Sequence, residues 1–220
     1  MRFLPLLSSL DDPAPWPMEA ELRWEGALHA GWRHPRRAVH ALHLPEGPLG
    51  APLLERAGEA LRQGLNPDFL VIPTGPLEDR TAGFALLGTL ETLLEVARGR
   101  VKLALRVEAA TRDRALGLLR EARAEAVGFC WTGGDPEPMA DRLWCAVGTE
   151  GTDLRPLQVL GYRWNVALPA TDPSEFAARV ADLRVAHPEV LFPAVMPDTA
   201  LGRPVLPDDS VSFGPGWGER

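Results

Sequence analysis

The sequence predicts an α/β fold in which short buried strands alternate with helices. Two observations support this prediction. From residue 68 onward, short apolar runs repeatedly give way to stretches in which apolar residues recur at helical spacing. The 22 prolines and 21 glycines fall between these segments rather than in one tract, which is typical of many short turns. Such alternation favours a parallel sheet, because each helix returns the chain to start the next strand.

The strands and helices of the second half have the clearest patterns. Residues 68–73 (DFLVIP) form a continuous apolar run, as in a strand buried on both faces. The further strands are predicted at residues 101–108, 126–131, 143–147 and 164–168. Helices are predicted at residues 84–97, beyond Thr111, at residues 154–160 and at residues 174–186, the last capped by Asp172 or Ser174.

The first half adds three strands, at residues 2–7, 21–25 and 39–44, and a helix at residues 53–65. Eight parallel strands can close into a barrel that side chains fill. Residues 8–20 and 26–38 are too rich in Pro, Gly, Trp and Arg to form regular helices. The predicted fold is therefore a trimmed (β/α)8 TIM barrel, with its first two helices shortened or replaced by loops.

The same pattern predicts a division of the chain into a barrel and a tail. Residues 1–192 hold all of the predicted strands and helices. Residues 193–220 are rich in Pro and Gly and form the predicted C-terminal tail.

Composition excludes several classes of partner. The formal net charge of −7 provides no basic field for a phosphate backbone, so no nucleic-acid partner is expected. No run approaches the roughly 18 apolar residues of a membrane span, and two cysteines do not make a disulfide framework. We therefore expect a cytoplasmic protein whose partner is a small-molecule ligand; the oligomeric state stays open.

Several segments, in this order, resemble one family of barrels. They are ALHLP at residues 41–45, FLVIPTG at 69–75, VKLALRVEA at 101–109, VGFCWTGG at 127–134 and GTEGTDL at 148–154. The set is similar to the xylose isomerase-like barrel superfamily, which includes sugar phosphate isomerases and epimerases and the endonuclease IV class of AP endonucleases (AP endonuclease family 2). The resemblance implies a ligand site at the C-terminal mouth of the barrel.

The resemblance also implies a divalent metal such as Zn, Mn or Mg, held by Glu, Asp, His and a second Glu. This sequence departs from that pattern at all four places. Arg106 stands at the fifth-strand Glu, Thr132 at the sixth-strand Asp, Pro169 at the eighth-strand Glu and Ile72 at the fourth-strand His. The inherited metal site is therefore predicted to be degenerate, and no cofactor is expected unless Glu108, Asp135, His43 and Glu25 rebuild one.

Two residues of the fifth strand are the candidate catalytic residues. Arg106 and Glu108 are two positions apart, so they share one face of the strand. Glu108 is the candidate base, and Arg106 is either a fixed cation for a phosphate or carboxylate, or the internal partner of Glu108 or Asp135.

The candidate substrate-binding residues are His43, Glu25, Trp131 and Asp135. Each has a structural alternative: His43 as a hydrogen-bonded histidine and Trp131 as core packing. Cys130 and Cys145 are expected to be buried structural thiols.

Two functions follow, and whether the chain is an enzyme stays open between them. The first is a divergent isomerase or epimerase that binds a small sugar-like or anionic ligand at the mouth and moves a proton next to a carbonyl. The second is a non-catalytic binding or scaffold protein, a pseudoenzyme that has lost the metal site. AP endonuclease activity would need zinc ligands and a positive groove, which the chain does not clearly offer.

Overall fold

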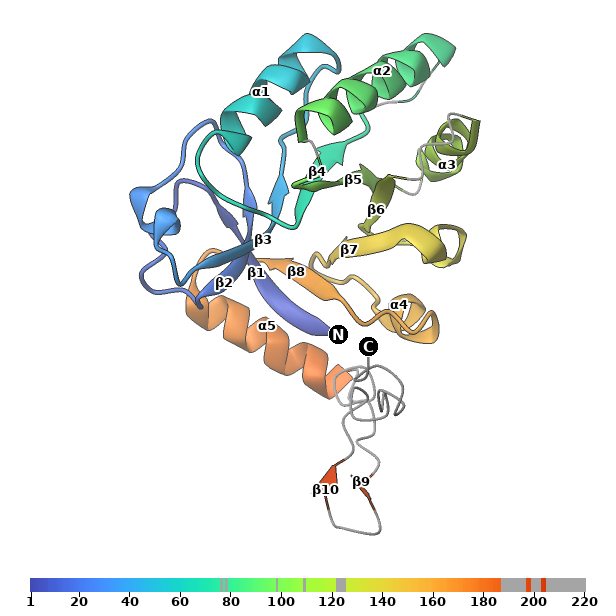
Figure 1. The fold of residues 1–220 in the computed structure, drawn as a ribbon. Helices are drawn as coiled ribbons and strands as arrows, with labels where there is room; N and C mark the ends of the chain where they lie inside the picture. The colour runs from blue at the N-terminus through green and yellow to red at the C-terminus, as the bar shows by residue number, and fades with distance from the viewer. Residues whose placement is uncertain are drawn as a thin grey trace, which may run out of the picture.

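The computed structural model is a closed barrel of eight parallel strands that follow one another in chain order (Figure 1). It describes residues 1–75, 77, 79–97, 99–108, 110–121, 126–186, 197–198 and 203–204. The strands are β1 (Arg2–Ser8), β2 (Glu19–Arg23), β3 (Ala38–His43), β4 (Phe69–Pro73), β5 (Lys102–Val107), β6 (Val127–Trp131), β7 (Leu143–Val147) and β8 (Asn165–Pro169). All eight strands correspond to predicted ones, and the predicted fold class is confirmed.

The helices lie on the outside of this ring (Figure 1). They are α1 (Ala51–Leu61), α2 (Arg80–Ala97), α3 (Arg112–Glu121), α4 (Arg155–Val159) and α5 (Pro173–Ala186), with 3-10 helices η1 (Ala30–Arg33) and η2 (Glu137–Arg142). Among these helices, none combines the length and the apolar character needed to cross a lipid bilayer.

The first two connections lack α-helices, as predicted. A loop joins β1 to β2, and the connection from β2 to β3 contains only η1. Trp32 in η1 covers the core where a helix would otherwise pack. Its ring is buried, and its Nε1 donates to the carbonyl of Asp11, 3.0 Å away. The connections that contain η2 and α4 are also short.

The barrel closes because β8 pairs with β1 over five residue pairs, from Arg2 with Asn165 to Leu6 with Pro169.

Two irregularities interrupt the otherwise regular ladder. The register shifts by one residue between β2 and β3, and again between β6 and β7. Each shift changes which side chains of β3 and β7 face the barrel axis.

Two apolar clusters fill the molecule. The larger one lies between the strands and the helices. The smaller one fills the barrel itself and consists of small or medium side chains: Leu6, Ala41, Val71, Ala104, Cys130, Cys145, Val147 and Ala167. Every strand except β2 contributes to this inner cluster, and β2 contributes the buried Glu21 instead.

Trp144 of β7 packs closely against Gly128 of β6. A Cβ atom at Gly128 would lie 2.2 Å from the indole ring of Trp144, so only glycine leaves room for the ring. Phe69 lies beside Trp144, with ring centroids 6.1 Å apart, and the Lys102 ammonium lies over both rings. This packing makes the barrel interior a core rather than a channel.

The predicted tail, residues 193–220, lies almost wholly outside the described residues. Within it, β9 (Pro197–Asp198) and β10 (Arg203–Pro204) form a short antiparallel pair. The predicted domain boundary after residue 192 also falls outside the described residues, so it stays a prediction.

Candidate functional site

Arg106 provides the cation of the barrel mouth. It lies near the C-terminal end of β5 on the same face as Ala104, which belongs to the inner cluster. Its Nη2 donates to Oε1 of Glu46, a residue of the loop between β3 and α1. The Arg106 side chain is 23% exposed and that of Glu46 is 63% exposed, so the pair borders solvent.

Glu46 is a partner that sequence reasoning missed. The expected partners were Glu108 and Asp135, and neither forms the ion pair in the structure. The signal was present, because Glu46 follows the end of β3 by three residues and loops at this end of neighbouring parallel strands meet at the mouth.

A second polar pair, His43 with Glu21, lies inside the barrel. Nε2 of His43 is 2.7 Å from Oε2 of Glu21, and both side chains are only 1% exposed. Nδ1 of His43 is buried and has no hydrogen-bond partner among the described residues. His43 is therefore a hydrogen-bonded interior histidine with one nitrogen left open.

Glu21 was not among the predicted site residues, although the sequence carries a signal for it. The outer cluster contains Ala20 and Leu22 of β2 and Trp24, the residue directly after it, so every second residue here faces outward. Alternation then turns Glu21 toward the barrel axis, where it meets His43 of the adjacent strand.

Cys130 and Cys145 are buried free thiols of the inner cluster. They lie opposite each other on the neighbouring strands β6 and β7. Burial raises the pKa of the Cys145 thiol well above its usual range, and the hydrogen bond and charge interaction with Cys130 and the charge of Glu21 raise it further. A thiol held protonated is a poor nucleophile, so Cys145 is suited to packing rather than to covalent chemistry.

Three other predicted site residues lie at the mouth end but do not contact the Arg106–Glu46 pair or the His43–Glu21 pair. Glu108 and Glu25 follow the ends of β5 and β2, and both are exposed. Asp135 forms a turn in which its Oδ1 accepts from the backbone N–H of Glu137 at 3.0 Å, while its carbonyl accepts from Arg112 Nη1 at 2.8 Å. The described contacts do not bring Glu108 to Arg106, or Glu25 and Asp135 to His43.

Trp131 lies on the other face of its strand, so the expectation of a ligand-facing ring was wrong. Cys130 faces the barrel axis, so the adjacent Trp131 points toward the helices, where it belongs to the outer cluster and is 1% exposed. Its Nε1 donates to the carbonyl of Gly134 at 3.0 Å. Core packing, the structural alternative, describes this residue.

The donor set at the mouth does not fit the divalent metal that the resemblance implies. Such a metal needs carboxylate or imidazole ligands, whereas Arg106 is a cation and Pro169 has no side-chain donor. Thr132 donates its hydroxyl to the carbonyl of Val107 at 3.2 Å, and the Ile72 side chain belongs to the outer cluster, between the strands and the helices. Within the described part of the chain, no three His, Cys, Asp or Glu residues are grouped to hold a metal ion.

A cavity of about 630 Å³ lies outside the barrel, beside the short α4. It is lined by residues 148–155, which include Glu150, by Leu168 of β8, and by one face of α5, which includes Glu175 and Asp182. Arg179 crosses from α5 to the strand ends and donates to the carbonyls of Pro169 and Gly148. No predicted site residue lines this cavity.

Comparison with known proteins shows the fold. No protein-family model matches the chain, and no curated protein matches it. Among solved structures, a xylose isomerase domain protein from Planctomyces limnophilus superposes with a TM-score of 0.62 at 11% identity, covering 86% of this chain and 97% of that one. A family 18 chitinase from Crocus vernus superposes with a TM-score of 0.46 at 12% identity, covering 87% and 99% of the two chains.

The first likeness agrees with the resemblance in the sequence at the level of fold: the chain is a closed parallel eight-stranded barrel that superposes on the barrel of that xylose isomerase domain protein. At this identity the likeness is one of fold and does not extend to ligand or chemistry.

Proposed function

We propose that this chain is a non-catalytic binding protein that holds a small anionic, sugar-like ligand at the C-terminal mouth of its barrel. The observation that carries the proposal is the position of Arg106. Its guanidinium stands where the resemblance places a metal-binding carboxylate, and its partner is a well-exposed carboxylate on a loop. Arg106 thus supplies a fixed positive charge where related barrels use a cation from solution.

The ion pair with Glu46 leaves Arg106 available to a ligand. A pair between side chains of this exposure contributes only about 0–1 kcal/mol, so an anion with better geometry can displace Glu46. A guanidinium offers a planar fork of donors that matches a phosphate or carboxylate in two parallel hydrogen bonds. The proposed ligand is therefore a sugar phosphate or sugar acid, and the proposed setting is the cytoplasm, with no nucleic acid or membrane involved.

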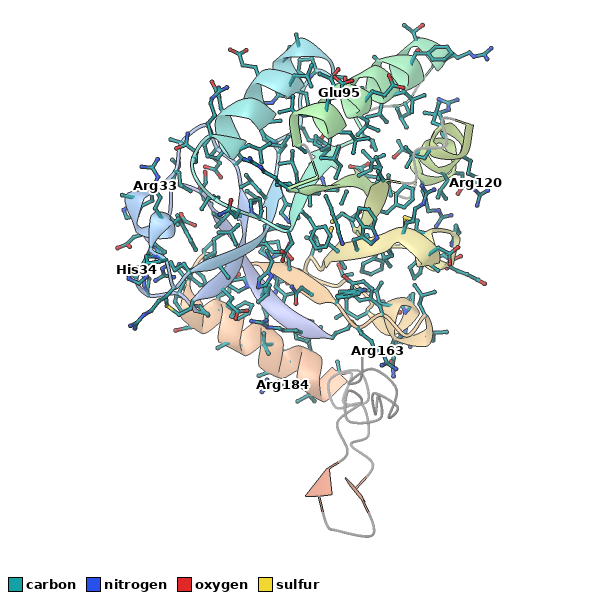
Figure 2. The ribbon with its side chains drawn as sticks, viewed as in Figure 1. Arg33, His34, Glu95, Arg120, Arg163 and Arg184 are labelled. Carbon is teal, nitrogen blue, oxygen red and sulfur yellow. The ribbon has the colours of Figure 1, made fainter. Side chains whose placement is uncertain are left out.

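The experiment is calorimetric titration of glucose 6-phosphate into the protein in the presence of a metal chelator. Arg106→Ala should weaken binding at the mouth at least about tenfold, because a charge-assisted hydrogen-bond pair is lost. Arg106→Lys should bind with intermediate affinity, and Glu46→Gln more tightly than the wild type, because the competing carboxylate is gone. The matched control is Arg163→Ala, which removes the same charge from an exposed site elsewhere on the molecule (Figure 2). Equal affinity in Arg106→Ala, or binding that needs a divalent metal, would contradict the proposal.

A second candidate is an isomerase or epimerase, and the His43–Glu21 pair is the observation that favours it. A carboxylate that orients an imidazole, with the other nitrogen open, is an arrangement suited to proton transfer. It ranks second because both side chains are 1% exposed, so a substrate cannot reach Nδ1 in this conformation.

Hydrogen exchange distinguishes the two candidates. Glucose 6-phosphate incubated with the protein in D₂O should keep its C–H protons if the protein only binds. Deuterium incorporation next to the carbonyl that is lost in His43→Gln would establish the enzyme instead. The fold of that variant is checked by its thermal melting curve.

A further inference from the structure

A basic cavity lies at the opposite end of the barrel from the mouth. It has a volume of about 380 Å³ and lies between the segment that leads into β3 and the loop between α1 and β4. Arg33, His34, Arg37, His40, Asn66 and Asp68 provide its polar lining. A (β/α)8 barrel places its usual site at the other end, so nothing in the proposed function uses this cavity.

The two guanidiniums of this cavity, those of Arg33 and Arg37, have no carboxylate partner among the described residues. Arg33 donates through Nη2 to the Gln63 side chain at 2.8 Å, and Arg37 donates through Nη1 to the carbonyl of Pro17 at 3.1 Å. Arg37 also stacks over the buried Trp32, with its Cζ 5.5 Å from the ring centroid. Neutral partners position both guanidiniums and leave their charge uncompensated, in a chain whose net charge is −7.

The one carboxylate that lines the cavity is already engaged. Asp68 Oδ2 lies 3.0 Å from Nδ1 of His40, whose Nε2 lies 3.2 Å from Oε2 of Glu19. Glu19 in turn pairs with Arg2. This series of contacts holds the Asp68 carboxylate against His40, and no contact in the described part of the chain joins it to Arg33 or Arg37.

His34 adds a third donor. It is exposed, and its Nδ1 accepts from the backbone N–H of Arg36 at 3.2 Å, so Nε2 is free to donate. Figure 2 shows His34 next to Arg33, with Arg163 and Arg184 well apart from both. Two guanidiniums and an imidazole around one cavity match the several acceptor oxygens of a dianion.

From this geometry we infer a second binding site, for the phosphate group of a soluble phosphate monoester, at the N-terminal end of the barrel. Arg33 and Arg37 bind the phosphate oxygens, and His34 donates a further hydrogen bond. The volume fits a phosphate with a small organic group attached.

The test uses the full chain carrying Arg106→Ala, so that the mouth does not contribute. Inorganic phosphate and glucose 6-phosphate are titrated calorimetrically, with glucose as the uncharged comparison. Both phosphates should bind and glucose should not. Adding Arg33→Ala should weaken phosphate binding about tenfold, and His34→Ala should weaken it less, whereas Arg163→Ala should leave it unchanged. Arg33 and His34 are exposed, so these variants should melt like the parent.

Three outcomes would overturn the inference. The first is no binding of either phosphate at millimolar concentration. The second is unchanged affinity in the Arg33→Ala variant. The third is binding only to phosphatidylcholine vesicles that contain phosphatidic acid, which would assign the cavity to a lipid headgroup rather than a soluble ligand. Failure here leaves the mouth proposal intact, because the two sites are tested with different variants.

Discussion

At the scale of single residues, the barrel interior combines a nearly apolar core with one buried polar pair. Glu21 and His43 occupy positions that other strands fill with Leu, Ala, Val or Cys. The 2.7 Å hydrogen bond between Nε2 of His43 and Oε2 of Glu21 offsets much of the cost of shielding these two side chains from water, although Nδ1 of His43 has no partner among the described residues.

We expect Glu21→Ala to destabilise the protein by about 3 kcal/mol, because it leaves the buried His43 without its partner. The double variant Glu21→Leu with His43→Leu should recover much of that loss, since apolar side chains need no partner there. Urea unfolding of the two variants and the wild type measures both effects. Equal stabilities for Glu21→Ala and the wild type would show that the pair does not stabilise the fold.

The limits of sequence reasoning are also clearest at single residues. Strands β4 and β6 are apolar on both faces, so their sequences carry no alternation that says which side chains face the axis. Ile72 and Trp131 were therefore placed at the mouth and lie in the outer core. In β2 the two faces differ, and the same kind of reasoning would have found Glu21.

At the scale of elements, the local sequence predicts which segments form strands and helices, but it predicts the first and last residues of each element less accurately. Strand β2 was predicted at residues 21–25 and runs over Glu19–Arg23. Its limits depend on pairing with β1 and β3, including the register shift, and long-range pairing leaves no local signal. Helix α5 shows the opposite case, because the predicted cap Asp172 is confirmed: its Oδ1 accepts from the N–H groups of Ser174 and Glu175, both at 2.8 Å.

Asp172→Ala should therefore cost about 1 kcal/mol, the usual value of an N-cap side chain. Asp182→Ala is the matched control, because it removes an exposed carboxylate from the body of the same helix. Chemical denaturation compares the two. If they lose equal stability, the cap is not the cause.

Glu175, in the first turn of α5, should make stability depend on pH in the acid range. The backbone N–H of Thr171, followed by its hydroxyl, lowers the pKa of Glu175 below its ordinary value of 4.5. A lowered folded-state pKa means that the stabilisation is complete above the unfolded-state value and is lost as the pH falls. The stability gap between the wild type and Glu175→Gln should thus be constant near neutrality and shrink below pH of about 4.5. A gap that widens toward low pH would contradict this sign.

Gly128 in β6 should tolerate no side chain. In Gly128→Ala the new methyl group would meet the Trp144 ring, and displacing that ring should cost about 1–3 kcal/mol or more. Gly117→Ala in α3 is the control, because no atom lies within 4 Å of the added Cβ, and alanine should stabilise that helix by about 1 kcal/mol. Thermal melting of the two variants should therefore shift in opposite directions, and a shift in the same direction would contradict the packing account.

At the scale of the whole molecule, the ring of strands is contained in the first 169 residues, and α5 ends at Ala186. We therefore propose that residues 1–192 fold without the tail. The truncated chain should unfold at the same urea concentration as the full chain and with the same slope, because the buried barrel surface is unchanged. A lower midpoint would show that the tail packs against the barrel.

Pairing of β8 with β1 has a consequence for synthesis on the ribosome. Strand β1 is made before the other seven strands of the barrel, but the edge that pairs with β8 stays open until residues 165–169 leave the exit tunnel. Until then the nascent sheet exposes two free edges, the form in which parallel sheets are most prone to aggregate. The slow step in folding the barrel should therefore be the pairing of β8, the last strand to be made, with β1, the first.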